Sequence, residues 1–430
     1  MKLAVSVGEL IPEKGGAFTF KEGVLRSLVK QASNRGYEII VLTSTPDTVS
    51  ALDLEGTIHV CDERINGHSS SQPQESPPFA KRVIKRSLRK LTRILPVQVS
   101  EPHEHTILPH RDKAAALTEK LVSEGAAVVL SLDAFNAHAF SIPHFVVVWD
   151  LQHRFQPFFP EVSSNGVWEY RERHFQRLLG RAAHVITGND EARKEVNLFY
   201  NVPTERIHTI PMPVPDTSQW GSASGDNAIL TKFGLKSPFL FYPAQFWPHK
   251  NHVTLLKAFA IALEELDSPI DLVFVGSDKG NLDHVQDVVR ELSLEQRIHI
   301  LGFVEREELG ALYRNALSLA FVTFFGPDNI PPLEAFSLGC PVIASDVAGS
   351  EEQMGDAAIR VNPVSQKSIA EAIQSIVQSE EVRDRLIEKG YERISNSSMD
   401  HYANSTYDLM DEFRGIRENW SATQPFNLKT

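Results

Sequence analysis

The chain has 430 residues, a length that favours two domains, and its 42% apolar and 23% charged residues are typical of a globular protein. Its net charge of −12 is uneven, because residues 1–215 carry 25 Lys and Arg against 24 Asp and Glu, whereas the remainder carries 18 against 31. The acidic second half argues against nucleic-acid binding there. A phosphate ligand in that half would have to be bound by a few individually positioned groups rather than by a broad basic surface.

Apolar, strand-like runs alternate with amphipathic stretches along the whole sequence. The strands expected in the first half are residues 2–8, 38–44, 126–132, 144–150 and 184–189. Those expected in the second half are residues 238–244, 270–277, 297–303, 317–323 and 341–346. Helical periodicity lies between them, for example at residues 253–266 and 307–316. This alternation, present twice, predicts an α/β protein with two Rossmann-like, doubly wound parallel-sheet domains facing a central cleft.

A stretch rich in Pro, Ser and Gly at residues 209–228 marks the expected domain boundary. We therefore predict an N-terminal domain at residues 1–215 and a C-terminal domain at residues 216–400. A C-terminal helix with a polar tail is expected at residues 401–430.

Two loops next to predicted strands contain residues that could bind a ligand. Gly15 and Gly16 follow the first strand and precede a helix, where glycines let the backbone approach a ligand closely; an ordinary loop is the alternative. Lys250 and Asn251 lie between a strand and a helix, at the strand edge where α/β domains bind ligands. A lysine there suits a diphosphate, although a solvated surface lysine is the competing interpretation.

Asp150 and His153 come at the end of the strand that covers residues 144–150. A carboxylate and an imidazole at a strand end can form an acid–base pair, and chance proximity is the alternative.

The stretch from 324 to 345, FFGPDNIPPLEAFSLGCPVIAS, predicts a loop, a helix and a short buried strand. Asp328 and Asn329 are residues of the helix-capping type, the paired prolines fit a first turn, and Gly339 suits the position that ends the helix. A helix N-terminus fixed in this way can hold an anion or a hydroxyl-rich ligand. Glu334 either contacts such a ligand or only complements the helix dipole.

The segment KRVIKRSLRKLTRIL, from Lys81 to Leu95, has seven basic residues in its first thirteen and leucine and isoleucine along one helical face. This pattern is typical of a helix that lies on an anionic membrane surface, and a solvated basic helix or a loop is the alternative. Cys61 and Cys340 are too few for a disulfide framework or a zinc cluster, and no apolar run is long enough to span a bilayer. We therefore expect a cytoplasmic protein without a signal peptide, which is peripheral on the inner face of the membrane if the basic segment binds there.

Taken in order, the motifs resemble those of family 4 retaining glycosyltransferases of the GT-B fold (glycosyl transferases group 1), over roughly residues 1–400. The segments that carry the resemblance are the glycine-pair loop, RGYEIIVLT, WDLQH, HVITGNDEARKEV, HKN, LVFVGS, LGFVEREELGALYRNA and NIPPLEAFSLGCPVIASDVAGSEE. The resemblance implies that the N-terminal domain faces the acceptor and that the C-terminal domain binds a nucleotide-sugar.

The resemblance also implies roles for individual residues. Glu334 is expected to contact the donor ribose and Lys250 the diphosphate, while Gly15 and Gly16 face the phosphates or the acceptor. The turn formed by Gly302, Phe303 and Val304 looks like the wall of the pocket that holds the nucleotide base. The remaining donor-binding residues expected are Gln245, Asn251, Asp328, Asn329, Ile330 and Leu333.

Three positions depart from the family pattern. Gly326 stands where many members have a glutamate, Gln245 where many have an arginine, and Trp149 where many have a histidine. His153 is a candidate replacement for the histidine, and Asp328 or Asn329 for the glutamate.

We therefore expect a retaining hexosyltransferase that moves a sugar from a nucleotide diphosphate sugar to a hydroxyl of a saccharide, lipid-linked or protein acceptor, in polysaccharide or glycoconjugate assembly. Its expected catalytic residues are Lys250, Asp150 and His153. Because the sequence has no Asp-x-Asp triplet, neither a metal nor another cofactor is expected. A non-catalytic nucleotide-sugar-binding or scaffold protein, or a nucleotide-sugar epimerase on the same fold, are the alternatives.

Overall fold

The structure is a computed structural model that describes residues 1–64, 108–236, 238–326 and 328–421. The basic segment from Lys81 to Leu95 lies outside the described residues. Within the described ranges, no helix is both long and apolar enough to cross a membrane.

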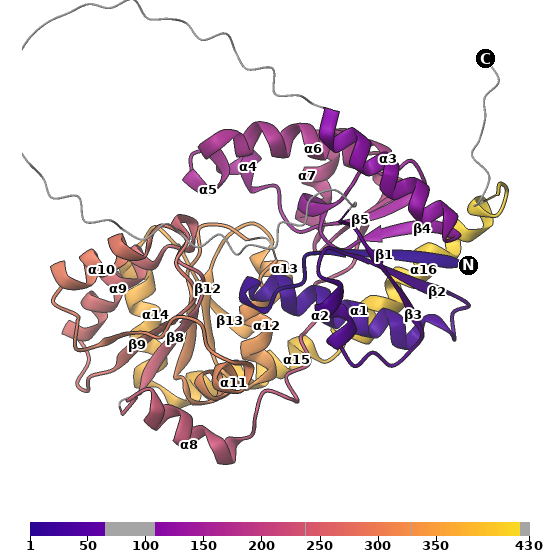
Figure 1. Ribbon diagram of the computed structural model, residues 1–430. Coiled ribbons are helices and arrows are strands. Elements are labelled where there is room, and N and C mark those ends of the chain that lie inside the picture. The colour runs from indigo at the N-terminus through magenta and orange to yellow at the C-terminus, as the bar shows by residue number, and fades with distance from the viewer. Residues whose placement is uncertain (65–107, 237, 327, 422–430) are drawn as a thin grey trace, which may run out of the picture.

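The N-terminal half forms a seven-stranded parallel sheet with the strand order β3-β2-β1-β4-β5-β6-β7 (Figure 1). Its strands are β1 (Lys2–Gly8), β2 (Glu38–Thr43), β3 (Ile58–Asp62), β4 (Ala126–Ser131), β5 (His144–Val148), β6 (His184–Thr187) and β7 (Ile207–Thr209). Its helices are α1 (Gly16–Ala32), α2 (Pro46–Ala51), α3 (Leu108–Ser123), α4 (Gln152–Phe155), α5 (Pro160–Ser163), α6 (Val167–Arg181) and α7 (Asp190–Tyr200). The central strands are buried along nearly their whole length, as expected when helices cover both faces of a parallel sheet.

The C-terminal half forms a six-stranded sheet, also parallel, with the order β10-β9-β8-β11-β12-β13. Its strands are β8 (Phe239–Pro243), β9 (Asp271–Val275), β10 (Ile298–Ile300), β11 (Ser318–Phe321), β12 (Val342–Ser345) and β13 (Ala358–Val361). Its helices are α8 (Ala223–Lys232), α9 (His252–Glu264), α10 (Leu282–Glu291), α11 (Arg306–Asn315), α12 (Ile330–Ser337), α13 (Ser350–Met354), α14 (Gln366–Gln378) and α15 (Glu380–Ile394).

The predicted fold class is confirmed, and each of the ten predicted strands overlaps an observed one. The sequence analysis missed β3, β7 and β13, and all three lie at an edge of their sheet. These three strands are short and only partly buried, and their sequences lack the continuous apolar run that identified the central strands. The predicted domain boundaries at residues 215 and 400 stay predictions.

The last helix, α16 (Met399–Arg417), returns from the C-terminal half and packs along α1 of the N-terminal half (Figure 1). Its apolar side chains, including Tyr402, Tyr407 and Phe413, belong to the core that covers the first sheet. The Tyr407 hydroxyl donates a hydrogen bond of 2.7 Å to the carbonyl oxygen of Leu28 on α1. The chain therefore crosses between the two domains twice.

We expect Tyr407→Phe to lower the free energy of unfolding by about 1 kcal/mol, because it removes this buried hydrogen bond and keeps the ring in place. Urea unfolding followed by circular dichroism measures the change. Ile416→Ala, at an exposed position of the same helix, is the control and should change stability little. Equal stability of Tyr407→Phe and the unchanged protein would contradict a contribution from the hydroxyl.

Candidate active site

A cavity of about 630 Å³ lies between the two domains. Its lining comes from the segments that follow β1 and β5 in the first sheet and β8 and β11 in the second. In each sheet, the order of strands reverses next to β1 and β8, and parallel sheets bind ligands outside the carboxyl ends of strands at such a point. The topology of both domains therefore places a ligand site at this cavity.

The glycine pair brings the start of α1 into contact with the start of α12. Gly15 has φ +60°, which favours glycine, and a Cβ atom on Gly16 would lie 3.3 Å from the Cβ of Ile330. Gly15, Gly16 and Ile330 all line the cavity. The positive ends of two helix dipoles thus meet at one place, an arrangement that favours an anion.

Lys250 supplies a cation to the same cavity. It ends the 3₁₀ turn Pro248–Lys250, and its Nζ atom lies 5.1 Å from the centre of the Phe321 ring. Burial lowers the pKa of Lys250 to about 8, although the carboxylates of Asp150 and Glu161 act in the opposite direction. Because this pKa lies above neutrality, the side chain is mostly cationic at pH 7.

Gln245 and Asn251, on either side of Lys250, have different surroundings. The Gln245 Nε2 atom donates to the carbonyl oxygen of Glu13, 3.0 Å away in the opposite domain, and Gln245 lines the cavity. Asn251 is buried, and its Nδ2 atom donates to the carbonyl oxygens of Val322 and Pro363, both at 2.8 Å. Asn251 therefore holds two loops together and does not line the cavity.

Asp150 and His153 are separated by the turn of α4. Asp150 lines the cavity, where Arg171 lies 3.4 Å from its Oδ1 atom. His153 is fully buried, stacks on Phe175 and has its Nε2 atom 3.0 Å from the Tyr200 hydroxyl. Burial, the largest cause, lowers the pKa of His153 to about 4. The structure therefore does not bring His153 to the cavity with Asp150.

The loop before α12 lines the cavity through Gly326, Asp328 and Asn329. Asn329 occupies the N-cap position, but its Nδ2 atom donates to the carbonyl oxygen of Gly326 at 2.6 Å, so its side chain does not cap the helix. Burial raises the pKa of Asp328 to about 7, against a hydrogen bond from Asn189 of the opposite domain that lowers it. This loop is thus fixed both to itself and to the N-terminal domain.

Glu334 and Leu333 lie inside α12 and do not line the cavity. The Oε2 atom of Glu334 accepts a 2.7 Å hydrogen bond from the Tyr313 hydroxyl, and burial raises the pKa of this carboxyl to about 7. Leu333 packs in the core of the C-terminal domain. At the C-terminal end of this helix, Gly339 has φ +67°, as expected for the residue that ends it.

The segment of Gly302, Phe303 and Val304 also lies away from the cavity lining. It follows β10 and precedes α11, with Gly302 at φ +72° and Phe303 half exposed. The carbonyl oxygen of Gly302 accepts a 2.9 Å hydrogen bond from the backbone N–H of Gly276, at the end of β9. The predicted role of this segment in binding a base stays a prediction.

Sequence reasoning missed a pair of residues that joins the domains across the cavity. The Nδ1 atom of His249 lies 2.6 Å from the Oε1 atom of Glu161, and both residues line the cavity. His249 precedes Lys250 and could have been suspected from that position. Glu161 lies at the start of the short helix α5, and nothing in its neighbourhood distinguishes it.

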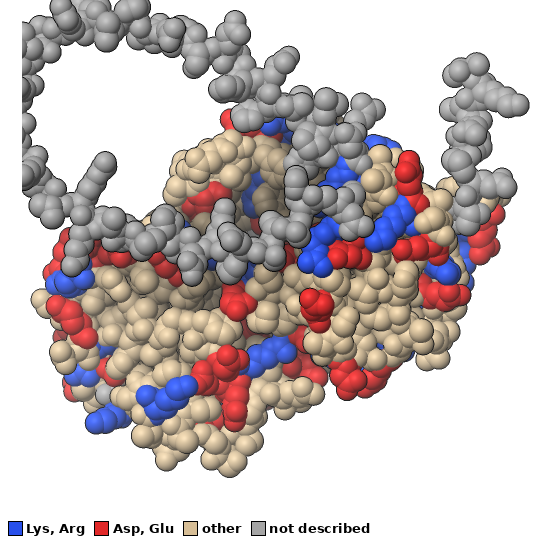
Figure 2. All heavy atoms as spheres, in the orientation of Figure 1, with Lys and Arg blue, Asp and Glu red and all other residues tan. Residues whose placement is uncertain are grey.

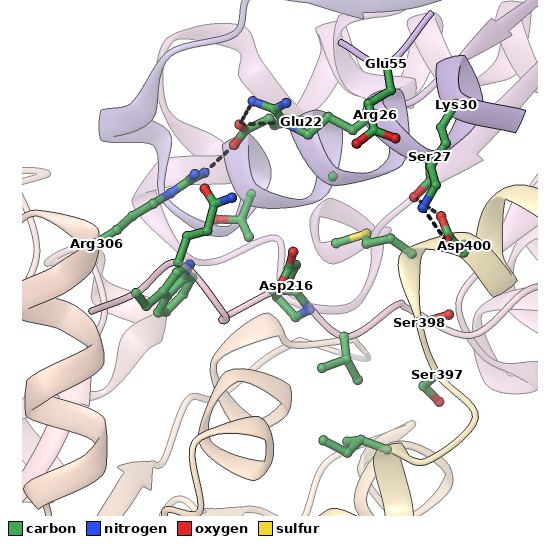
Figure 3. A pocket seen from close by; sticks show the side chains of 18 of the residues that line it. Glu22, Arg26, Ser27, Lys30, Glu55, Asp216, Arg306, Ser397, Ser398 and Asp400 are labelled. Carbon is green, nitrogen blue, oxygen red and sulfur yellow. Dashed lines mark hydrogen bonds and ion pairs between the residues drawn. The ribbon is translucent and has the colours of Figure 1, made fainter. Parts of the chain in front are cut away.

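A second cavity, of about 720 Å³, lies where the chain passes between the domains (Figure 3). The connecting segments at residues 214–220 and 394–400 line it, together with α1. Within it, the Glu22 carboxylate on α1 accepts hydrogen bonds from Arg26 of the same helix and from Arg306 at the start of α11. The Arg306 guanidinium also lies over the Phe18 ring, so it attaches the C-terminal domain to one face of α1.

Acidic and basic side chains are interspersed on the face of the molecule shown in Figure 2.

Comparison with known proteins finds a family match in the C-terminal half of the chain. Residues 230–393 match the family described as "Glycosyl transferases group 1". O-antigen chain mannosyltransferase B of Escherichia coli is 26% identical over 248 residues, which cover 57% of this chain and 65% of that relative. The match therefore spans slightly less than two thirds of the relative's length.

Two solved structures resemble the whole chain. WaaG, a glycosyltransferase involved in lipopolysaccharide biosynthesis, has a TM-score of 0.67 at 14% identity, over 95% of this chain and 99% of its own. HepE of Anabaena, solved in complex with UDP and glucose, has a TM-score of 0.65 at 14% identity, over 96% of this chain and 100% of its own. The chain therefore has the two-domain GT-B fold of these glycosyltransferases, and its residues 230–393 match the glycosyl transferases group 1 family.

Proposed function

We propose that the protein is a retaining glycosyltransferase that moves a sugar from a nucleoside diphosphate sugar to a saccharide hydroxyl in polysaccharide or glycoconjugate assembly. The observation that carries this proposal is the position of Lys250, a cation in the interdomain cavity where the N-termini of α1 and α12 meet. The mannosyltransferase relative and the UDP and glucose bound in HepE support a nucleoside diphosphate sugar as the donor.

The departing diphosphate acquires negative charge as the sugar leaves. Lys250 would neutralise part of this charge, and the backbone N–H groups of the first turn of α1, at Gly16 and Ala17, would donate hydrogen bonds to it. Each such preorganised donor is worth about 3 kcal/mol in a transition state. Asp150 lines the cavity from the N-terminal domain, where it would orient the sugar or the acceptor hydroxyl.

Incubation with a panel of UDP-, GDP- and dTDP-sugars, with and without oligosaccharide acceptors, tests the proposal. We expect release of nucleoside diphosphate and a glycosidic product whose anomeric configuration, read by NMR, is that of the donor. Binding of a nucleotide-sugar without turnover would point to a non-catalytic protein. Conversion of the donor sugar without an acceptor would point to an epimerase.

We also propose that transfer needs no divalent metal, because Lys250 and two helix N-termini already meet the charge of the diphosphate. The rate in excess chelator should equal the rate in untreated buffer. A rate that collapses in chelator and returns on addition of Mn²⁺ would contradict this expectation.

A further inference from the structure

The Glu161 carboxylate of the N-terminal domain contacts His249 of the C-terminal domain, and only one of its two oxygens accepts hydrogen bonds. Its Oε1 atom accepts two hydrogen bonds from His249, one from the backbone N–H at 3.1 Å and one from Nδ1 at 2.6 Å. Its Oε2 atom is buried and has no hydrogen-bond partner, and the Glu161 side chain is only 7% exposed. Buried oxygens without a partner are uncommon, because leaving one unsatisfied costs free energy.

Glu161 is ionised near neutral pH. Burial alone would raise its pKa, but the hydrogen bonds from His249 and from its own backbone N–H together outweigh burial and hold the pKa below its usual value. Burial lowers the pKa of His249, so the imidazole is neutral and donates from Nδ1. A charged oxygen that lacks a partner is a strong acceptor for a hydroxyl group.

The surroundings hold Glu161 beside the expected position of the donor. His249 is the residue before Lys250, and a sugar is bonded directly to the diphosphate that Lys250 would bind. The segment before Glu161 is fixed against the C-terminal domain, because the Gln156 Nε2 atom donates to the carbonyl oxygen of Phe324 at 2.8 Å and the Phe159 ring stacks on that of Phe324. A hydroxyl of the group next to the diphosphate would therefore lie close to Oε2.

We infer that Glu161 is a donor-binding residue whose Oε2 atom accepts a hydrogen bond from a hydroxyl of the transferred sugar, and that His249 holds it in position from the opposite domain. This inference rests on the proposed function. Because the two residues lie on different domains, this sugar contact is complete only when the domains are together. Separation of the domains gives the hydroxyl its access to Oε2, and closure around the sugar supplies the missing partner.

Glu161→Gln tests the inference, because its amide oxygen can still accept both hydrogen bonds from His249 while the charged Oε2 atom is lost. Calorimetry would compare GDP with GDP-mannose and UDP with UDP-glucose. For the sugar nucleotide that the unchanged protein binds, we expect the Kd to rise roughly tenfold or more, the effect of losing a hydrogen bond to a charged group. The Kd of the matching nucleoside diphosphate should stay the same.

Deoxy analogues of the sugar identify the hydroxyl that is recognised. Removal of that hydroxyl should weaken binding to the unchanged protein and have no further effect on Glu161→Gln. Glu169→Gln, which makes the same chemical change at an exposed position of α6, is the control. If Glu161→Gln folds poorly, Glu161→Asp replaces it in the test. Aspartate keeps the charge but is shorter by one methylene, so we expect it to weaken binding of the sugar nucleotide selectively.

The outcomes separate the inference from the proposed function. Parallel weakening of nucleoside diphosphate and sugar nucleotide would mean that Glu161 only joins the domains, and equal affinities in the variant and the unchanged protein would exclude any role; either result overturns the inference. If the unchanged protein binds none of GDP, UDP, dTDP and their sugars, the proposed function fails as well.

Discussion

Lys250→Ala should lose at least about 100-fold in kcat for sugar transfer, the effect of removing one preorganised charge donor from a transition state. Lys250 is one of the cations that line the interdomain cavity, with Lys14 and Arg171, and it is the one to which we assign the diphosphate. Its side chain packs over the Phe321 ring. Steady-state kinetics at matched folded fraction measures the loss. Turnover at the rate of the unchanged protein would exclude Lys250 from the reaction.

The pH dependence of nucleotide binding gives a second test of Lys250. Its pKa of about 8 means that the side chain is cationic below pH 8 and becomes neutral as the pH rises through this value. Affinity for a nucleoside diphosphate should therefore be greatest below pH 8 and decline above it. Lys250→Arg is the matched control, since its guanidinium stays charged and its affinity should not change between pH 7 and 9.5. Equal pH dependence in both proteins would assign the titration to another group.

Glu334→Gln should weaken nucleotide binding by roughly 1–3 kcal/mol if the carboxylate contacts ribose hydroxyls, because a charged acceptor becomes a neutral one. Isothermal titration calorimetry measures the difference, and Glu371→Gln on the exposed side of α14 is the control. In the structure the carboxylate is buried against the Tyr313 hydroxyl, so a purely structural role is the competing outcome. Unchanged nucleotide affinity would select that role.

Glu334 also makes the stability of the protein depend on pH. Its pKa of about 7 in the folded protein lies above the ordinary value of 4.5, so the folded state binds more protons than the unfolded state between these values. Its contribution to stability is therefore complete below about pH 4.5 and is lost as the pH rises to 7. Glu334→Gln should remove on the order of 3 kcal/mol of this dependence. Urea unfolding at pH 5 and pH 8 measures it, and part of the dependence should remain because Asp328 and Glu195 also have a pKa of about 7.

The sequence predicted the architecture because central parallel strands are continuous apolar runs separated by helices. It also singled out Asp150, Lys250 and the glycine pair, because each stands just after a strand or before a helix, and all of them line the cavity; their catalytic and binding roles stay predictions. It could not place His153, since one turn of α4 directs this side chain into the core, where it meets Tyr200, 47 residues away. Glu161 and His249 are 88 residues apart and become neighbours only when the domains meet. Such pairs depend on the relative position of two separate sheets, which no local pattern encodes.

The return of α16 to the first domain has a consequence for the order in which the protein folds on the ribosome. The C-terminal sheet and its helices α8 to α15 form one uninterrupted stretch of chain, whereas the N-terminal domain needs residues 399–417 to cover the apolar face of α1. That helix is synthesised after the whole C-terminal sheet, so the first domain stays incomplete until the second has emerged. The N-terminal domain is therefore the last to complete its core, the reverse of the usual order during synthesis.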